Sequence, residues 1–199
     1  MPHLYYCLNP TDGRSPSEVA SFEHDLGRRL LAYGLREQYD LFFSEDDLSF
    51  GPKGKPYLSE NPEIHFSISH CRGLVVCALN DKPIGADAEA PRKRIFASIK
   101  RRILSAEEQA FLDRFSDDPA LERQWFLRFW TLKEAYVKYL GTGISSDMKA
   151  VSFSFDNDEQ PICSDPGLSC FQTVLNDGFV ISLVCQDPMS SAELHEISF

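Results

Sequence analysis

Apolar and polar residues follow one another along this chain with two different periods, which predict helices in some segments and strands in others. Between residues 17 and 39 apolar residues recur every three or four positions, as in an amphipathic helix. Residues 64–69 alternate with period two, and residues 73–79 form a continuous apolar run. Both patterns are typical of strands, and residues 84–89 predict the next one.

The second part of the chain repeats this order of helix before strands. Helices are predicted at residues 95–104, from Ser105 onward and at 121–140, and strands at 150–155, 169–175 and 179–185. A short strand is also predicted at residues 4–8, and the residues after Pro188 are expected to form a tail. The pattern therefore predicts an α+β fold of two similar halves, residues 1–89 and 90–199.

Composition limits the classes of function. The chain has 199 residues, of which 43% are hydrophobic and 25% charged, as in ordinary globular proteins. No apolar run approaches the ~18 residues of a membrane span, and the N-terminus lacks the pattern of a secretory signal. We therefore expect a cytoplasmic protein without a membrane partner. The net charge of -10 argues against broad nucleic-acid binding. The six cysteines include no C-x-x-C pair, so we expect neither a zinc site among them nor a disulfide.

Basic residues are nevertheless concentrated in one short segment. It contains Arg92, Lys93, Arg94, Lys100, Arg101 and Arg102. A local basic patch on an acidic protein suggests a specific anionic partner, but a solvated helix face would carry the same charges. Charge alone leaves both interpretations open.

The predicted helix at 121–140 carries the first candidate chemistry. Trp130, Glu134 and Lys138 lie four residues apart, so in a helix they share one face. A carboxylate and an ammonium then lie beside an aromatic ring, and Gly141 and Gly143 follow where the helix ends. Considered alone, this pair is more simply a surface ion pair.

A second acidic pair lies in the strand predicted at residues 84–89. Asp87 and Glu89 project to one face of that strand, and two adjacent carboxylates repel each other unless a cation or proton neutralises them. Oxygen ligands of this kind suit Mg²⁺. A D-x-E sequence alone more often marks an exposed strand end, but together with Glu134 it predicts a three-carboxylate magnesium site.

Candidate phosphate-binding residues occur in three places. Lys55 follows a glycine in a loop, Ser69 and His70 lie at a strand end, and Lys138 is one turn beyond Glu134. Each has a structural alternative, such as a solvated lysine or a turn. Their combination with the carboxylates indicates a magnesium–diphosphate site.

These motifs, taken in order, resemble those of a known family. They are Gly-Lys-Pro at 54–56, Phe-Ser-Ile-Ser-His at 66–70, Ile-Gly-Ala-Asp-Ala-Glu at 84–89, Phe-Trp-Thr-Leu-Lys-Glu-Ala-Tyr-Val-Lys at 129–138 and Gly-Thr-Gly at 141–143. The chain resembles the 4′-phosphopantetheinyl transferases, and within them the surfactin-synthetase-activating (Sfp-like) type. That type has two pseudo-symmetric α+β halves with the active site between them.

The resemblance implies a function. The protein would transfer the 4′-phosphopantetheine moiety of coenzyme A to a serine of an apo acyl, peptidyl or aryl carrier protein, with Mg²⁺, releasing adenosine 3′,5′-bisphosphate. Asp87, Glu89 and Glu134 would hold Mg²⁺, Glu134 would act as base, and Lys138 would stabilise the leaving group. The residues implied to bind coenzyme A are Lys55, Ser69, His70, Asp87 and Lys138. A monomer would suffice for this site.

The chain departs from the family pattern at two places. Ala86 and Ala88 stand where Ile or Val usually flanks the aspartate. The segment before the first long helix is short and lacks a stretch rich in lysine and arginine, so Arg28 and Arg29 are expected to substitute in holding the 3′-phosphate. Acidic carrier proteins are expected to dock on the basic segment.

Two other functions remain open at this point. One is a magnesium-dependent nucleotide hydrolase that uses the same carboxylates, and the other is a carrier-binding protein with a decayed active site. Intact carboxylates and Lys138 argue against decay.

Overall fold

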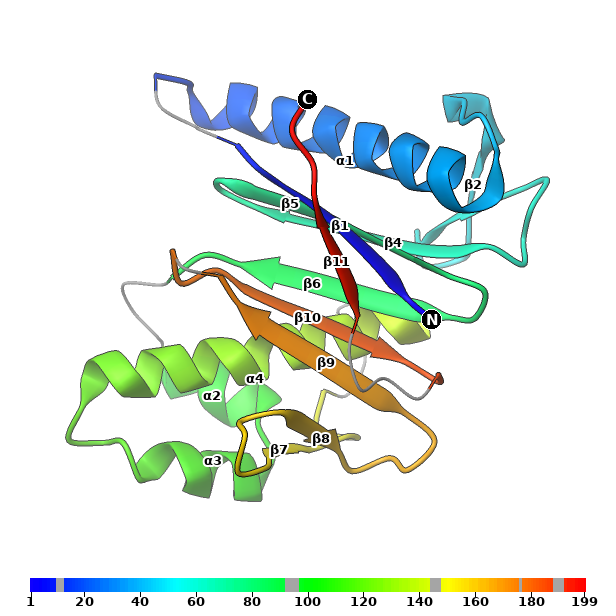
Figure 1. Ribbon diagram of the computed structural model, residues 1–199. Coiled ribbons are helices and arrows are strands. Elements are labelled where there is room, and N and C mark those ends of the chain that lie inside the picture. The colour runs from blue at the N-terminus through cyan, green and yellow to red at the C-terminus, as the bar shows by residue number, and fades with distance from the viewer. Residues whose placement is uncertain (10–12, 92–96, 144–147, 176, 188–191) are drawn as a thin grey trace.

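The computed structural model describes residues 1–9, 13–91, 97–143, 148–175, 177–187 and 192–199. Its elements form four layers, in the order helix, sheet, sheet and helix (Figure 1). In chain order they are β1 His3–Leu8, α1 Pro16–Tyr39, η1 Glu45–Asp47, β2 Leu48–Phe50, β3 Pro56–Leu58, β4 His65–Cys71, β5 Leu74–Asn80, β6 Ile84–Glu89, α2 Ala97–Ile103, α3 Ala106–Asp113, α4 Pro119–Leu140, β7 Phe153–Phe155, β8 Pro161–Cys163, β9 Ser169–Val174, β10 Val180–Cys185 and β11 Glu193–Glu196. The predicted α+β class is confirmed.

Helix α1 covers the first sheet, whose strand order is β11-β1-β5-β4. A capping box between Ser15 and Glu18 begins the helix, and its leucines pack on the sheet in one buried cluster. The helix approaches the sheet closely at two glycines. A Cβ atom at Gly27 would lie 2.8 Å from Ile68 Cγ2, and one at Gly34 would lie 2.6 Å from Leu79 Cδ1. Small residues at these positions let the helix pack this closely.

Helix α4 covers the second sheet, whose strand order is β6-β10-β9. A Cβ atom at Gly85 of β6 would lie 2.0 Å from the carbonyl oxygen of Ala135 and 2.3 Å from the nitrogen of Tyr139. The backbones of β6 and α4 are therefore in direct contact. Because side chains alternate along a strand, Asp87 projects to the same face of β6 as Gly85, toward α4.

The two sheets pack against each other through an apolar layer that includes Leu4, Val76 and Leu183. Ala86 and Ala88 belong to this layer, so the two alanines that depart from the family pattern face the inter-sheet core.

Two serines join the sheets where β4 lies beside β6. Ser67 Oγ accepts a hydrogen bond from the Ala86 nitrogen at 2.9 Å, and Ser69 Oγ accepts one from the Ala88 nitrogen at 3.3 Å. The hydroxyl groups satisfy backbone donors of β6 that would otherwise be unpaired in the interior. The period-two pattern predicted at residues 64–69 thus places both serines on the face of β4 that meets β6.

The expectation of a tail after Pro188 is wrong for residues 193–196. These residues form β11, which pairs in parallel with β1 at the edge of the first sheet. The segment is largely polar, so its hydrophobic pattern gives no strand signal, and pairing with β1 supplies the structure.

The proposed division into halves at residues 89 and 90 stays a prediction. Strand β6, which ends the first predicted half, is hydrogen-bonded to β10 from the second. None of the described helices combines the length with the apolar character that a membrane-spanning segment needs.

Candidate functional site

A cavity of about 310 Å³ lies between β4, β6 and α4. Its lining includes six of the candidate site residues, Ser69, His70, Asp87, Glu89, Glu134 and Lys138, together with Ile68, Ala88 and Trp130. A second cavity of about 320 Å³ shares Ile68, Glu134 and Lys138 with the first and extends to Lys55 and Gly143. Three separate parts of the chain therefore contribute to one hollow region.

Asp87 is the most enclosed carboxylate of this region, with 5% of its surface exposed. Its Oδ1 accepts hydrogen bonds from Ser69 Oγ at 2.8 Å and from Lys138 Nζ at 2.7 Å. Its Oδ2 is buried and has no hydrogen-bond partner. A buried carboxylate oxygen without a donor is costly unless a cation or ligand completes it.

Lys138 and Ser69 complete a compact group around Asp87. Lys138 Nζ also donates to Ser69 Oγ at 2.7 Å, and 31% of the lysine side chain remains exposed. The ion pair is therefore reachable from solvent. The sequence placed Lys138 near phosphates but gave no sign that Asp87 would be its partner.

Trp130 and Glu89 form a second contact across the cavity. The Trp130 Nε1 group donates to Glu89 Oε1 at 2.9 Å. The sequence placed Trp130 on the face of Glu134 and Lys138, and the structure adds this orienting hydrogen bond. Glu134 lies one helical turn from both Trp130 and Lys138, and all three line the same cavity, as the spacing predicts.

The donor set is of the type that a hard divalent cation takes, because the unpartnered Asp87 oxygen, Glu89 and Glu134 border one cavity. In the present arrangement the ammonium group of Lys138 neutralises Asp87. Among the described residues, one group of three possible metal ligands has its ligand atoms within 4.8 Å of one another. This group lies outside the cavity and consists of His3, Glu193 and His195.

Lys55 connects the loop before β3 to the end of α4. Its Nζ donates to the carbonyl oxygens of Lys138 at 2.6 Å, Ile84 at 3.1 Å and Tyr139 at 3.2 Å. Burial lowers the pKa of Lys55 to about 8. The side chain therefore acts as a cap for the last turn of α4 and lines the second cavity.

His70 lies at the rim and contacts an acid that the sequence did not single out. Its Nδ1 lies 3.2 Å from Oε2 of Glu23 in α1, and Glu23 Oε1 accepts a hydrogen bond from the Gly73 nitrogen at 3.2 Å. Glu23 is buried on a helix whose other buried residues are mostly apolar. A charged residue on the apolar face of α1 was the signal that could have found it.

Arg28 and Arg29 line neither cavity. Arg28 Nε lies 3.5 Å from Glu45 Oε1, and the Arg29 guanidinium lies over the ring of Phe199 at 4.2 Å. The structure thus does not bring them to the other site residues. Their role toward the 3′-phosphate stays a prediction.

The basic segment is described only in part. Arg92, Lys93 and Arg94 lie outside the described residues, whereas Lys100 in α2 forms an ion pair with Glu122 of α4. Arg101 and Arg102 are exposed. Within the described part of the basic segment, these two arginines are accessible to a partner.

A buried ion pair on the other side of α4 was missed. Lys133 and Glu108 are both fully buried, 2.9 Å apart. Lys133 also donates to the carbonyls of Met148 and Val151, which connects α4 to α3 and the segment before β7.

Comparisons with known proteins show which family the chain is similar to. Residues 83–184 match the model of the 4′-phosphopantetheinyl transferase superfamily. This range contains Asp87, Glu89, Glu134 and Lys138, whereas Lys55, Ser69 and His70 precede it.

Two curated relatives match over longer ranges. The chain is 33% identical to the 4′-phosphopantetheinyl transferase Sfp of Bacillus subtilis (strain 168) over 135 residues, covering 68% of this chain and 59% of the relative. It is 30% identical to the 4′-phosphopantetheinyl transferase psf-1 of Bacillus pumilus over 175 residues, covering 86% of this chain and 74% of the relative. The chain thus spans about three fifths to three quarters of the length of these two relatives.

A solved structure is also similar, the holo-[acyl-carrier-protein] synthase of Thermotoga maritima. It is 23% identical with a TM-score of 0.42, covering 54% of this chain and 64% of that one. On the family match and the relative from Bacillus pumilus, the chain belongs to the 4′-phosphopantetheinyl transferase superfamily.

Proposed function

We propose that this protein transfers the 4′-phosphopantetheine moiety of coenzyme A to a serine of an apo carrier protein, in a Mg²⁺-dependent reaction that releases adenosine 3′,5′-bisphosphate. The observation that carries the proposal is the state of Asp87. One of its oxygens is held by Ser69 and Lys138, and the other is buried without a hydrogen-bond partner. Glu89 and Glu134 line the same cavity, as a cation-binding site requires.

Asp87, Glu89 and Glu134 are the residues that would hold the metal. When bound, Mg²⁺ supplies charge neutralisation at the diphosphate and a fixed orientation for in-line attack. Ser69 and Trp130 orient the carboxylates of Asp87 and Glu89 through hydrogen bonds. These contacts hold two of the three carboxylates in place before a ligand arrives.

Glu134 is proposed as the general base. It lines both cavities, which supports a position next to both coenzyme A and the carrier serine. A carboxylate in hydrogen-bond reach of a hydroxyl group can accept its proton during attack.

Basic and hydroxyl side chains are proposed to contact the phosphates of coenzyme A. Lys138 is partly exposed beside Asp87 and would stabilise charge on the departing bisphosphate. Ser69, His70 and Lys55 would add contacts along the two cavities. For Lys55 this requires exchanging one of its carbonyl acceptors for a phosphate oxygen.

Arg28 and Arg29 are retained as candidates for the 3′-phosphate. Their neighbour Gly27 packs on Ile68, which lines both cavities. The arginine side chains therefore begin close to the site even though they line neither cavity.

One assay tests the reaction. The protein is incubated with coenzyme A, Mg²⁺ and apo carrier proteins of fatty-acid, polyketide and peptide synthesis, and the carriers are weighed by mass spectrometry. We expect a gain of one phosphopantetheine, abolished by chelation and by Asp87→Ala or Glu134→Ala. Glu107→Ala, which removes an exposed glutamate on α3, is the matched control and should retain activity.

Two outcomes would contradict the proposal. No mass gain with any carrier would remove the transfer reaction, and cleavage of coenzyme A without a carrier would indicate the nucleotide hydrolase instead. Full activity in both alanine variants would refute the metal and base assignments.

We further propose that carriers dock on the exposed part of the basic segment. Carrier proteins are commonly acidic, and Arg101 and Arg102 are both exposed on α2. Arg101→Glu with Arg102→Glu should raise the KM for the carrier and leave the KM for coenzyme A unchanged. Arg14→Glu with Lys149→Glu makes the same charge change at exposed positions elsewhere and should alter neither. An unchanged carrier KM in the α2 variant would remove this docking site.

A monomer is proposed to contain the whole active site, because β4, β6 and α4 of one chain line it.

A further inference from the structure

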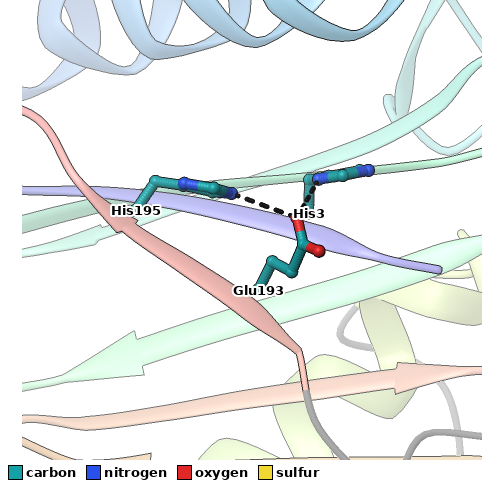
Figure 2. A group of neighbouring side chains, drawn as sticks. All are labelled: His3, Glu193 and His195. Atoms are coloured by element: carbon teal, nitrogen blue, oxygen red, sulfur yellow. Dashed lines mark ion pairs between the residues drawn. The ribbon is translucent and has the colours of Figure 1, made fainter.

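Three side chains of the terminal strands meet at the edge of the first sheet. His3 comes from β1, and Glu193 and His195 come from β11 (Figure 2). Oε2 of Glu193 lies 3.3 Å from Nδ1 of His3 and 3.6 Å from Nε2 of His195. All three atoms lie within 4.8 Å of one another. The group is separate from the cavities lined by Asp87 and Glu134.

The parallel pairing of β1 with β11 creates this arrangement. In register, His3 lies opposite Glu193 and Tyr5 lies opposite His195. Side chains two residues apart share a face, so the three candidate ligands project to the same side of the sheet. The His195 ring also stacks on Tyr5, with ring centroids 5.0 Å apart, which fixes its orientation.

Two ring nitrogens of the group lack hydrogen-bond partners. Nδ1 of His3 and Nε2 of His195 are both buried from solvent and unsatisfied, although each faces Glu193. Unsatisfied buried nitrogens cost free energy unless something completes them.

We propose that His3, Glu193 and His195 form a binding site for a divalent transition-metal ion of the Zn²⁺ type. Zinc binds histidine nitrogen and carboxylate oxygen at about 2.0–2.2 Å in tetrahedral geometry, so neighbouring ligand atoms lie roughly 3.3 Å apart. The two distances from Glu193 are close to that spacing, and the two nitrogens lie within 4.8 Å of each other.

The ligand types separate this site from the carboxylate site. Two imidazoles and one carboxylate favour zinc, copper or nickel, whereas Mg²⁺ prefers oxygen ligands alone. Glu193 is about half exposed, so a water molecule can fill the fourth position. The bound ion would fasten the short edge strand β11 to β1 and stabilise the folded state by mass action.

Isothermal titration calorimetry of the untagged protein with Zn²⁺ tests the site by measuring affinity and stoichiometry. We expect one equivalent of Zn²⁺ to bind to the wild type. His3→Ala, His195→Ala and Glu193→Gln should each bind at least about tenfold more weakly, because losing a ligand should reduce metal affinity at least as much as losing a residue that only hydrogen-bonds to a ligand. His24→Ala removes an exposed histidine of α1 and should bind as the wild type. Asp87→Asn should also bind as the wild type, which separates this site from the proposed magnesium site.

Thermal unfolding gives a second measurement. Zn²⁺ should raise the Tm of the wild type and of His24→Ala but not that of Glu193→Gln, whose exposed side chain makes it the variant that disturbs packing least. The proposal is overturned if the wild type binds no Zn²⁺, if Glu193→Gln and His195→Ala bind as tightly as the wild type, or if only Asp87→Asn loses the ion.

Discussion

Helix α4 carries two lysine–carboxylate pairs that differ in how completely their polar atoms are satisfied. Lys133 and Glu108 are fully buried, and each makes further hydrogen bonds to backbone groups. Lys138 and Asp87 form an equally short pair, but the lysine is partly exposed and Asp87 Oδ2 has no hydrogen-bond partner. We call them the closed pair and the open pair.

The difference separates structural from functional charge. The closed pair has its donors and acceptors occupied by protein groups, so it can take no ligand without losing a contact. The open pair retains an unsatisfied oxygen next to a cavity, and two further carboxylates line that cavity. Incomplete satisfaction at a partly accessible site is the feature that indicates ligand binding.

The largest effect is expected when the closed pair is broken. Lys133→Ala leaves Glu108 buried without its cation, which should reduce the free energy of unfolding by about 3–5 kcal/mol. Urea denaturation measures this loss. Lys53→Ala, at an exposed lysine, should change stability little. A loss below 1 kcal/mol for Lys133→Ala, an order-of-magnitude limit, would show that the closed pair is not structural.

Breaking the open pair should reduce activity strongly and stability little, the reverse of what is expected for the closed pair. Asp87→Asn removes a proposed metal ligand, so carrier modification should fall by at least about 100-fold. Stability should change by less than about 1 kcal/mol, because the carboxylate is already only partly satisfied in the folded state. Rates from intact-protein mass spectrometry and urea denaturation of the same sample test both parts. If stability falls as far as in Lys133→Ala, the contrast between the two pairs is lost.

Gly85 tests whether the open pair depends on the contact between α4 and β6. Alanine at this position would place its Cβ 2.0 Å from the Ala135 carbonyl oxygen, so α4 must move. We expect a loss of roughly 1–3 kcal/mol in stability, together with reduced activity. Gly54→Ala replaces a glycine whose Cβ would meet no atom, but its positive φ of 83° adds backbone strain. Gly51→Ala, with its nearest contact at 3.5 Å, is therefore the better control.

The sequence singled out the residues of the open pair, although not their pairing, and it missed the closed pair, for a physical reason. Asp87, Glu134 and Lys138 follow the periods of a strand and a helix, so local spacing places them on defined faces. Their meeting depends on Gly85, whose close approach to α4 has no local signature. Glu108 is one of two acids in the first turn of α3, and spacing does not show which of the two becomes buried.

The long helices and most of the strands were predicted because their apolar residues are periodic. Strand β11 was missed because its residues are mostly polar and its pairing with β1 is made between opposite ends of the chain. Contacts at such sequence separation leave no local pattern, and the proposed His3–Glu193–His195 site could not be found for the same reason.

Lys55 is a third lysine to compare with the two pairs, because its three hydrogen bonds go to backbone carbonyls rather than to a carboxylate. Its replacement is expected to have the smallest effect. Burial lowers the pKa of Lys55 to about 8 in the folded state, below the ordinary value of the unfolded chain, about 10.4. Between these values the unfolded chain binds more protons, so the contribution of Lys55 to stability should rise as the pH increases from 8 to 10. Urea denaturation of wild type and Lys55→Met across this range isolates the effect as a difference. If that difference is flat, the carbonyl acceptors hold Lys55 charged through this pH range.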